Sequence, residues 1–227
     1  MKIQYDGWEL PFFDKAKNFR NYQYLLTRKY IKGDVAEIGP GNGTNLKLYK
    51  KHARKVFLFE PTIKNFLKLK KKFNEDNIFI KNNFLLENKK KFDTILYFDV
   101  LEHIKNEQTE LSLAYNVLKN NGYLIINVPA FSHLFSNFDR DVNHFRRYSK
   151  KDIIYLIKNF KIKYVKMKYY DSLGYIFSLI NKFFFKNYKK NFKQKIKFWD
   201  FLIPLSKFID NLTFNSFGKS LLIIIKK

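Results

Sequence analysis

The chain has 227 residues, 46% of them hydrophobic, which is enough for one domain with a buried core. It has no cysteine, no visible signal peptide and no apolar run of the ~18 residues that a membrane span needs, so disulfides, thiolate metal sites and cysteine nucleophiles are excluded and a cytoplasmic location is expected. The formal net charge of +24 has two open explanations, an anionic partner or the lysine-rich composition of an AT-rich genome.

Strand and helix patterns alternate along most of the chain. Residues 1–32 predict a helical lead-in, because aromatic and aliphatic residues recur there at helical spacing. Strands are expected at residues 35–38, 56–59, 78–80, 92–98, 123–128, 161–170 and 220–225. Helices are expected at residues 44–51, 63–73, 107–119 and 150–159. This alternation predicts an α/β sandwich around a mostly parallel sheet.

The domain is expected to divide into four segments within residues 1–227. The lead-in precedes a cofactor-binding core over residues 33–170, which contains a long loop at 130–149. Residues 171–216 form an insertion between the last two strands, expected to be helical, basic and aromatic. Residues 217–227 supply the last strand.

A glycine turn follows the first expected strand, in the order Glu37-Ile38-Gly39-Pro40-Gly41-Asn42-Gly43. A dinucleotide-binding turn has the spacing G-x-G-x-x-G and offers backbone N–H groups to a pyrophosphate, which an adjacent carboxylate would repel. S-adenosylmethionine instead brings a sulfonium and an ammonium group, and an acid at the strand end attracts both. Glycines let the backbone approach such a ligand closely. The turn therefore predicts an S-adenosylmethionine site.

A second acid strengthens this interpretation. Glu60 ends the next expected strand, where its carboxylate can accept hydrogen bonds from both ribose hydroxyls of an adenosyl group. A glycine turn alone is often only a turn, and an acid at a strand end is often only solvated. The two acids and three glycines in this order favour the cofactor site over those simpler explanations.

The sequence here resembles the class I S-adenosylmethionine-dependent methyltransferases, in particular bacterial enzymes of the methyltransferase 11/23 type that are similar to UbiE and other ubiquinone methyltransferases. The resemblance covers about Phe19 to Lys226. It is carried by the glycine turn, by Phe59-Glu60-Pro61, and by three later segments, Asp99 to Ile104, Val117 to Ala130 and His144 to Ser149. It implies a three-layer Rossmann-like sandwich whose seven-stranded sheet is mostly parallel, with an antiparallel last strand.

The resemblance also implies a set of cofactor contacts, with S-adenosylhomocysteine as the product. The third strand of such enzymes is usually followed by an aspartate that meets the adenine amino group, and here the candidate is Asn83, whose carbonyl can still accept that hydrogen bond. Phe84 is expected to stack on the adenine. The expected cofactor-binding residues are Glu37, Gly39, Gly41, Asn42, Gly43, Glu60, Pro61, Asn83, Phe84, Asp99, Val100 and Leu101.

The catalytic candidates lie in the loops after the fourth and fifth strands, which face the ligand in such a sheet. Methyl transfer requires alignment of a nucleophile and, for a hydroxyl, removal of its proton. His103 is a candidate base, although a histidine that only packs beside the cofactor explains it as well. Asp139, His144 and Arg147 are candidates for holding an acidic or phosphorylated acceptor, or form an ion-pair network that orders the loop. No metal site is predicted.

The insertion combines charge with an aromatic stripe. Residues 182–197 contain seven lysines and no acid. Phe184, Tyr188, Phe192, Ile196 and Trp199 recur at three or four residues, as on one face of a helix. Residues 182–199 therefore predict peripheral contact with an anionic membrane, while docking of the stripe onto the domain is the simpler alternative. Nucleic acid is a less favoured partner, because arginine is scarce.

The function expected from the sequence is methylation of a small-molecule, sugar or lipid-linked acceptor at oxygen. An RNA or protein methyltransferase is one alternative, although the chain has no Asn-Pro-Pro-Tyr-like motif and no cysteine for attack on a pyrimidine. A cofactor-binding, membrane-peripheral protein without catalysis is the other, and the intact acids around the glycine turn argue against it. The sequence does not identify the acceptor or the oligomeric state.

Overall fold

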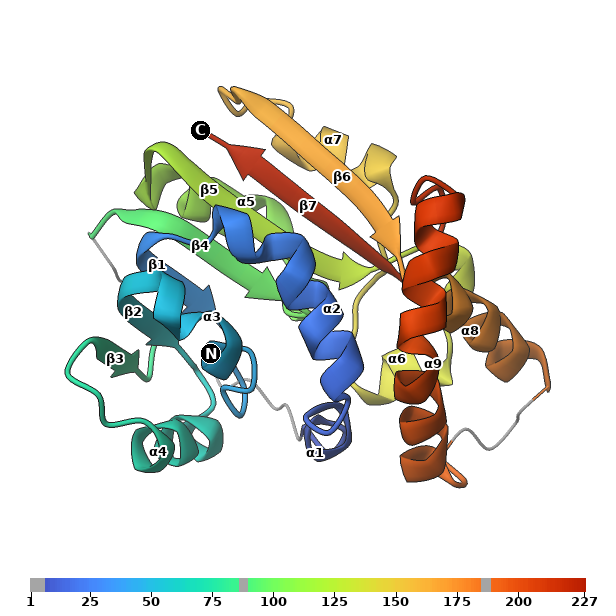
Figure 1. Ribbon diagram of the computed structural model, residues 1–227. Helices are drawn as coiled ribbons and strands as arrows, with labels where there is room; N and C mark the ends of the chain where they lie inside the picture. Colours follow the sequence, from blue (N-terminus) through green and yellow to red (C-terminus); the bar gives the residue numbers. More distant parts are fainter. Residues whose placement is uncertain (1–6, 86–89, 185–188) are drawn as a thin grey trace.

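A twisted seven-stranded sheet forms the centre of the computed structural model, which describes residues 7–85, 90–184 and 189–227 (Figure 1). The strand order is β3-β2-β1-β4-β5-β7-β6. The strands are β1 (Gly33–Ile38), β2 (Ala53–Phe59), β3 (Ile78–Lys81), β4 (Phe92–Phe98), β5 (Leu118–Pro129), β6 (Tyr164–Tyr170) and β7 (Ser220–Lys226). β1 to β5 pair in parallel, and β7 pairs antiparallel with both β5 and β6. The predicted mostly parallel sheet with an antiparallel last strand is confirmed.

Helices cover both faces of the sheet. The helices are α1 (Leu10–Phe13), α2 (Lys17–Thr27), α3 (Leu46–Tyr49), α4 (Ile63–Lys72), α5 (Glu107–Val117), α6 (Asn137–Asp141), α7 (Lys150–Ile157), α8 (Ser172–Phe184) and α9 (Phe192–Leu212). Side chains of α5 and α7 pack in one core with one face of the sheet, and side chains of α2, α3, α4 and α9 pack in a second core with the other face. The molecule is thus the predicted three-layer sandwich.

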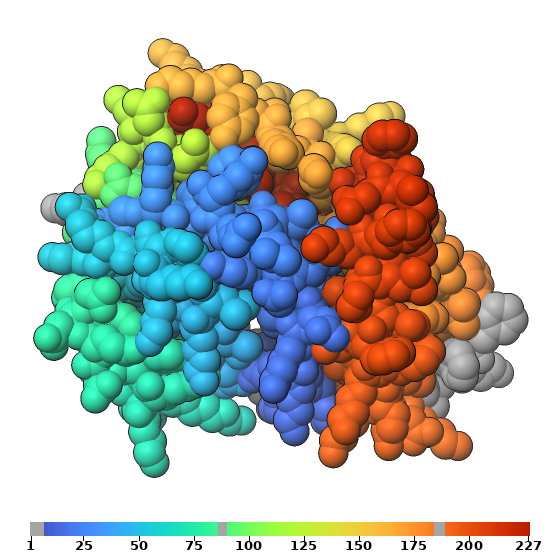
Figure 2. Space-filling view, viewed as in Figure 1, coloured from blue at the N-terminus to red at the C-terminus, as the bar shows by residue number. Residues whose placement is uncertain are grey.

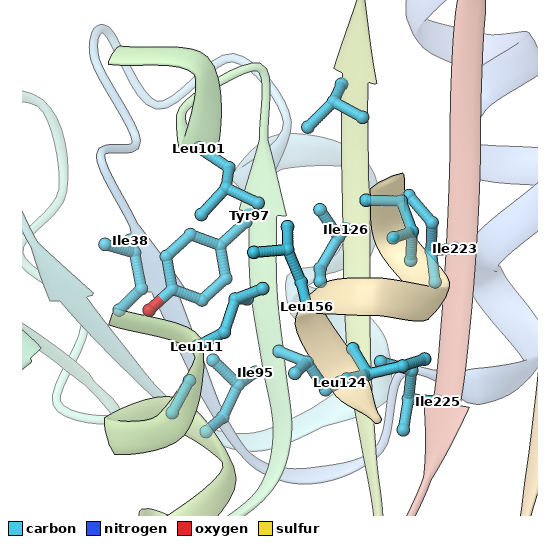
Figure 3. Close-up of a cluster of buried hydrophobic side chains, with 14 of the residues drawn as sticks. Ile38, Ile95, Tyr97, Leu101, Leu111, Leu124, Ile126, Leu156, Ile223 and Ile225 are labelled. Atoms are coloured by element: carbon cyan, nitrogen blue, oxygen red, sulfur yellow. The ribbon is translucent and has the colours of Figure 1, made fainter. Parts of the chain in front are cut away.

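The central strands are buried on both faces, which explains why they are almost continuously apolar. Figure 3 shows the core beneath α5 and α7, where Tyr97 of β4 lies between Ile38 of β1 and Leu101. Along β4, Ile95 and Tyr97 belong to this core, whereas Leu96 belongs to the opposite one. This alternation with a period of two keeps the register fixed, so the carboxyl ends of β1, β2 and β4 stay aligned.

Several predicted elements differ from the structure. The helix expected at 107–119 ends at Val117, because β5 begins at Leu118 and not at residue 123. The helix expected at 44–51 is only α3 followed by a 3₁₀ turn over Lys50–His52, because residues 41–45 continue the turn that begins at Gly39. The sixth strand begins at Tyr164 rather than at residue 161. By contrast, α7 begins where predicted: Ser149 accepts a hydrogen bond from the Asp152 N–H, and Asp152 accepts one from the Ser149 N–H.

The insertion over 171–216 is helical, as expected, but it does not contain one helix across residues 182–199. α8 ends at Phe184, and residues 189–191 form a turn in which Asn191 adopts a left-handed conformation with φ of 58°. The prediction of a continuous helix is therefore wrong. Two members of the predicted stripe, Tyr188 and the side chain of Phe184, lie outside the described residues. α9 then runs along the edge of the molecule next to the lead-in, as Figure 2 shows in red and blue.

The last part of the apolar stripe predicted for the insertion, from Phe192 to Trp199, packs against the rest of the protein. Phe192 packs against Trp8, Phe12 and Phe138, and Trp199, only 5% exposed, packs against Phe19. Within the described ranges, no helix combines the length and the apolar composition needed to cross a bilayer.

Buried polar groups fix α9 in place. Asp210 of α9 is fully buried and accepts hydrogen bonds from the Tyr22 hydroxyl and from the backbone N–H groups of Asp171 and Ser172. The Trp199 indole N–H donates to the Asp171 carboxylate over 2.8 Å. These bonds join the lead-in, α9 and the start of α8 into one unit, because each buried polar group would cost free energy without its partner.

Candidate functional site

The predicted cofactor residues lie along one edge of the sheet, at the carboxyl ends of neighbouring parallel strands. Glu37 is near the end of β1, Glu60 directly follows β2, and Asp99 directly follows β4. Asn83 follows β3 on the same side. Ligands of open α/β sheets bind at such an edge, where strand order reverses, and here the reversal lies between β1 and β4.

The three glycines of the turn all adopt left-handed backbone conformations, with φ between 55° and 68°. A Cβ on Gly39 would lie 2.9 Å from a methyl carbon of Val100, and one on Gly43 would lie 2.6 Å from the Phe73 ring. A Cβ on Gly41 would meet only Leu10, at 3.5 Å. Packing therefore requires Gly39 and Gly43 to lack side chains whether or not a ligand is bound, and Gly41 remains the glycine with open space in front of it.

Glu37 is buried beneath the turn, with 2% of its surface exposed. The Tyr49 hydroxyl donates a hydrogen bond of 2.6 Å to its carboxylate. Burial raises the pKa of Glu37 to about 7, and the opposing effects of the Tyr49 hydrogen bond and the Arg20 charge only partly offset it. A nearby cation stabilises a buried carboxylate more than an exposed one, because its positive charge replaces the water that burial removed.

Glu60 is held against the turn by backbone hydrogen bonds. The Gly41 N–H donates to one carboxylate oxygen and the Thr62 N–H donates to the other, each over 3.0 Å. Burial raises its pKa, against the effect of these hydrogen bonds. The Asn82 side chain donates to the backbone carbonyls of Glu60 and Pro61, which fixes the strand end.

Arg20 of the lead-in joins this edge, although the sequence does not single it out. Its guanidinium lies 3.6 Å from the Asp99 carboxylate, and its Nε is buried with no hydrogen-bond partner among the described residues. Asp99 also accepts a hydrogen bond of 2.7 Å from the Asn127 amide of β5. Only the packing of α2 against the sheet reveals Arg20, because its short sequence context contains no recognisable motif.

The other predicted cofactor residues differ in what their side chains face. The side-chain carbonyl oxygen of Asn83 is buried and has no hydrogen-bond partner in the described parts of the chain, as expected of a group that accepts a hydrogen bond from adenine. Phe84 beside it is partly buried. The Asn42 amide instead donates to Asp14 of the lead-in. The Leu101 side chain is fully buried in the core beneath α5 and α7 (Figure 3). The sequence predicted these residues from their positions after the strands, which do not reveal the direction of a side chain.

The four catalytic candidates come together beside Asp99. Asp139 of α6 is fully buried and pairs with Arg147, whose Nε and terminal nitrogen donate to its two oxygens over 2.9 and 3.0 Å. The same carboxylate accepts a hydrogen bond of 2.9 Å from Nδ1 of His144. These partners hold the pKa of Asp139 at about 2 despite its burial. Both carboxylate oxygens of Asp139 are therefore engaged by its two partners.

His103 packs edge-on against His144, with ring centroids 4.6 Å apart. Burial lowers the pKa of His103 to about 3, and the nearby His144 adds to this shift. Glu102, which is 1% exposed, points Oε1 to within 3.8 Å of Nε2 of His144, and burial raises the pKa of Glu102 well above its usual value. Glu102 lies in the predicted loop but is not among the predicted site residues, because only the fold brings it to His144.

Comparisons with known proteins agree with the fold. A family model described as a methyltransferase domain matches residues 13–163. The fold is similar to a SAM-dependent methyltransferase from Archaeoglobus fulgidus, at a TM-score of 0.65 and 19% identity, covering 97% of this chain and 98% of that one. It is also similar to a chain in the complex between the Haloferax volcanii Trm112 methyltransferase activator and a putative methyltransferase, at a TM-score of 0.68 and 11% identity, covering 100% of this chain and 98% of that one. A third similar structure is N-methyltransferase NodS from Bradyrhizobium japonicum, solved with S-adenosylhomocysteine. Its TM-score is 0.58 at 12% identity, and the match covers 98% of this chain and 92% of that one. No curated protein sequence matches.

Proposed function

Since this chain belongs to the methyltransferase domain family, we propose that it transfers a methyl group from S-adenosylmethionine to an oxygen of a lipid-linked acceptor at a membrane surface. The exposed side of α9 carries the lipid-linked part of this proposal. The polar cluster beside Asp99 supports transfer to oxygen. The similarity to UbiE and other ubiquinone methyltransferases, which the sequence suggested, is compatible with such an acceptor.

The residues at the sheet edge fit the cofactor. S-adenosylmethionine supplies an electrophilic methyl group on a positively charged sulfur. The buried Glu37 carboxylate suits the ammonium group, and the unpartnered Nε of Arg20 suits the carboxylate at the same end of the ligand. Glu60 suits the ribose hydroxyls, and the unpartnered carbonyl of Asn83 suits the adenine amino group. The ammonium, the carboxylate, the ribose hydroxyls and the adenine amino group thus each have a matching group on this chain.

Transfer to a hydroxyl requires groups that hold the hydroxyl and accept its proton. Glu102 and His144 provide an oxygen and a ring nitrogen only 3.8 Å apart, and Asp139 fixes the His144 ring from behind. This cluster begins three residues after Asp99, so it lies next to the cofactor edge.

The outward face of α9 is apolar over four turns. Phe198, Phe201, Leu205, Phe208 and Leu212 recur at three or four residues, and each is at least 50% exposed. The opposite face, with Trp199, Ile203, Ser206 and Asp210, is buried on the protein. We call the five outward residues the α9 stripe. Lys193 and Lys197 are exposed near its beginning, and Lys207 is exposed further along.

A stripe of this kind suits an anionic membrane. Aromatic and leucine side chains insert at the boundary between headgroups and acyl chains, while lysines attract anionic lipid. The large positive net charge of the chain acts in the same direction. Contact through the α9 stripe replaces the contact through residues 182–199 that the sequence suggested, since Phe192 and Trp199 are packed on the protein.

Vesicle flotation tests the membrane contact. We expect the wild-type chain to float with phosphatidylglycerol vesicles and to stay in solution with neutral phosphatidylcholine vesicles. A Phe201→Ser/Phe208→Ser variant removes two members of the α9 stripe and should lose flotation, whereas Ile154→Ser/Tyr155→Ser on α7, two residues that are also exposed, should keep it. Equal flotation of both double variants, or a chain that stays soluble with either lipid but forms dimers through the α9 stripe, contradicts the membrane contact.

Methyl transfer itself is tested with labelled S-adenosylmethionine and two fractions of a bacterial extract, one of membrane lipids and one of water-soluble metabolites. We expect label in the lipid fraction, bound through an ether or ester oxygen. Label that appears only on RNA, on protein or on a soluble amine contradicts the proposed acceptor. No label above that of a Glu60→Ala control contradicts the proposed reaction.

A further inference from the structure

Glu102, His103 and His144 place three potential metal ligands around one point. One ligand atom from each residue lies within 4.8 Å of the others, and Oε1 of Glu102 is 3.8 Å from Nε2 of His144. Ligands of a tetrahedral site with bonds of about 2.0–2.2 Å are separated by roughly 3.5 Å, so small side-chain rotations bring this group into range. The sequence does not reveal the group, because His144 lies 41 positions after His103.

Both imidazole rings are held from behind, as metal-binding histidines are. Nδ1 of His144 is hydrogen-bonded to the buried Asp139 carboxylate over 2.9 Å, which leaves Nε2 directed at Glu102. The His103 ring is hydrogen-bonded to the backbone of Asn143. Histidine ligands nearly always donate their second ring N–H to a carboxylate or a backbone carbonyl, which fixes the tautomer and the ring orientation.

The carboxylate of Glu102 is short of partners. Its Oε2 atom is buried and has no hydrogen-bond partner in the part of the chain that the structure describes. Arg147 has a favourable electrostatic effect on it, but the guanidinium of Arg147 is already bound to both oxygens of Asp139 and to the Ala130 carbonyl. A buried carboxyl oxygen without a hydrogen-bond partner is costly, and a bound cation would offset that cost.

Backbone hydrogen bonds tie the two loops that carry these residues. The Phe145 N–H donates to the Glu102 carbonyl over 2.8 Å, and the His144 N–H donates to the Asp139 carbonyl over the same distance. The ligand atoms therefore sit on a rigid frame rather than on independent loops, which suits a bound ion.

We propose that Glu102, His103 and His144 bind a divalent transition-metal ion of the zinc class. Two imidazoles and one carboxylate favour zinc, iron or cobalt over magnesium or calcium, which prefer sites made of oxygen ligands only. Three protein ligands leave a coordination position open, as in catalytic zinc sites.

Resting on the proposed function, the open position takes the hydroxyl oxygen of the acceptor. The charge of the ion favours the deprotonated hydroxyl, whose proton passes to solvent, so in the metal-bound protein Glu102 and His144 act as ligands and do not take the proton themselves. The oxygen–methyl bond then forms as the sulfur–methyl bond breaks, and the electron pair of the broken bond stays on the sulfur of S-adenosylhomocysteine. The ion is neither oxidised nor reduced.

Cobalt and zinc binding to the full chain tests the proposal without any acceptor. After treatment with a chelator, the wild type should bind one equivalent of Co²⁺ with a visible absorption band, which Zn²⁺ abolishes and excess Mg²⁺ does not. His144→Ala and Glu102→Gln should each weaken Co²⁺ binding at least about tenfold, and His52→Ala, a histidine paired with Tyr24 away from the cluster, should not.

A stability measurement guards against variants that are merely unfolded. Zn²⁺ should raise the Tm of the wild type and of His52→Ala, and it should leave the Tm of a folded His144→Ala variant unchanged. Equal cobalt affinity in wild type and His144→Ala, or binding of Mg²⁺ in preference to Zn²⁺, overturns the metal site. Since no acceptor is present, failure of the lipid or methyl-transfer experiments leaves this result unaffected.

Discussion

The two halves of the functional edge are built in different ways. On the cofactor half, Glu37 and Glu60 each lie at the end of a strand. Glu37 accepts a hydrogen bond from the Tyr49 hydroxyl, and Glu60 accepts one from the Gly41 N–H. On the acceptor half, Asp139, His144 and Arg147 depend on one another, and Asp139 alone contacts both others. A residue held by a strand end can be lost singly, whereas a member of a buried network cannot.

The largest expected effect is on the acceptor half. Asp139→Ala leaves the buried Arg147 charge unpaired and should lower the free energy of unfolding by about 3–5 kcal/mol. Urea denaturation measures it, with Asp141→Ala as the control, since the exposed Asp141–Lys189 pair is worth less than about 1 kcal/mol. Adding Arg147→Ala should restore part of the loss, and a strictly additive double variant would show that the network is not coupled.

A somewhat smaller effect is expected from Glu60→Ala on the cofactor half. Loss of two charged hydrogen bonds to the ribose should weaken S-adenosylhomocysteine binding by about 3 kcal/mol, roughly a hundredfold. Isothermal calorimetry measures it. Glu75→Ala, which removes a half-exposed acid paired with Lys50, serves as the control. Unchanged affinity in Glu60→Ala would refute the ribose contact.

The pH dependence of cofactor binding sharpens the role of Glu37. Its pKa of about 7 in the free protein lies above the usual 4.5, so the folded protein keeps this carboxyl protonated in acid and the anionic form appears only as the pH approaches 7. A cationic ligand favours the anion. Affinity for S-adenosylmethionine should therefore rise up to about tenfold per pH unit below pH 7 and level off above it. Glu37→Gln should flatten this part of the profile, and an unchanged slope in that variant contradicts the assignment.

The smallest expected effect concerns Asn83. Asn83→Leu removes the acceptor for the adenine amino group and should weaken binding of S-adenosylhomocysteine by about 1 kcal/mol. The same change should hardly affect the inosine analogue, which has an oxygen in place of the amino group. Competition binding with both ligands measures the difference, and an equal loss for both would assign Asn83 a structural role instead.

Short local patterns were enough to select the candidates for the cofactor half. The strand that ends at Glu37 and the turn after it are continuous in sequence, so Glu37, Gly41 and Glu60 can be selected from the order of residues alone. The same patterns could not show that Gly43 leaves room for the Phe73 ring or that the Asn42 amide donates a hydrogen bond to Asp14, because both partners are distant in sequence.

The acceptor half and the insertion could be predicted only in part. His103, Asp139, His144 and Arg147 can be selected from residue type, yet their division into a buried network and an adjoining cluster with Glu102 depends on long-range packing. α9 has apolar residues on two faces, so periodicity could not decide which face docks. The buried partners Tyr22 and Asp171 of Asp210 decide it.

The position of β7 has a consequence for how this sheet can assemble. β7 lies between β5 and β6, although residues 171–219 separate it from β6 along the chain. β6 therefore has no strand to pair with until Ser220–Lys226 has been synthesised and inserted beside β5. During synthesis the edge of β5 stays open for this long interval, so late insertion of β7 is expected to be the slow step and the moment of greatest exposure to aggregation.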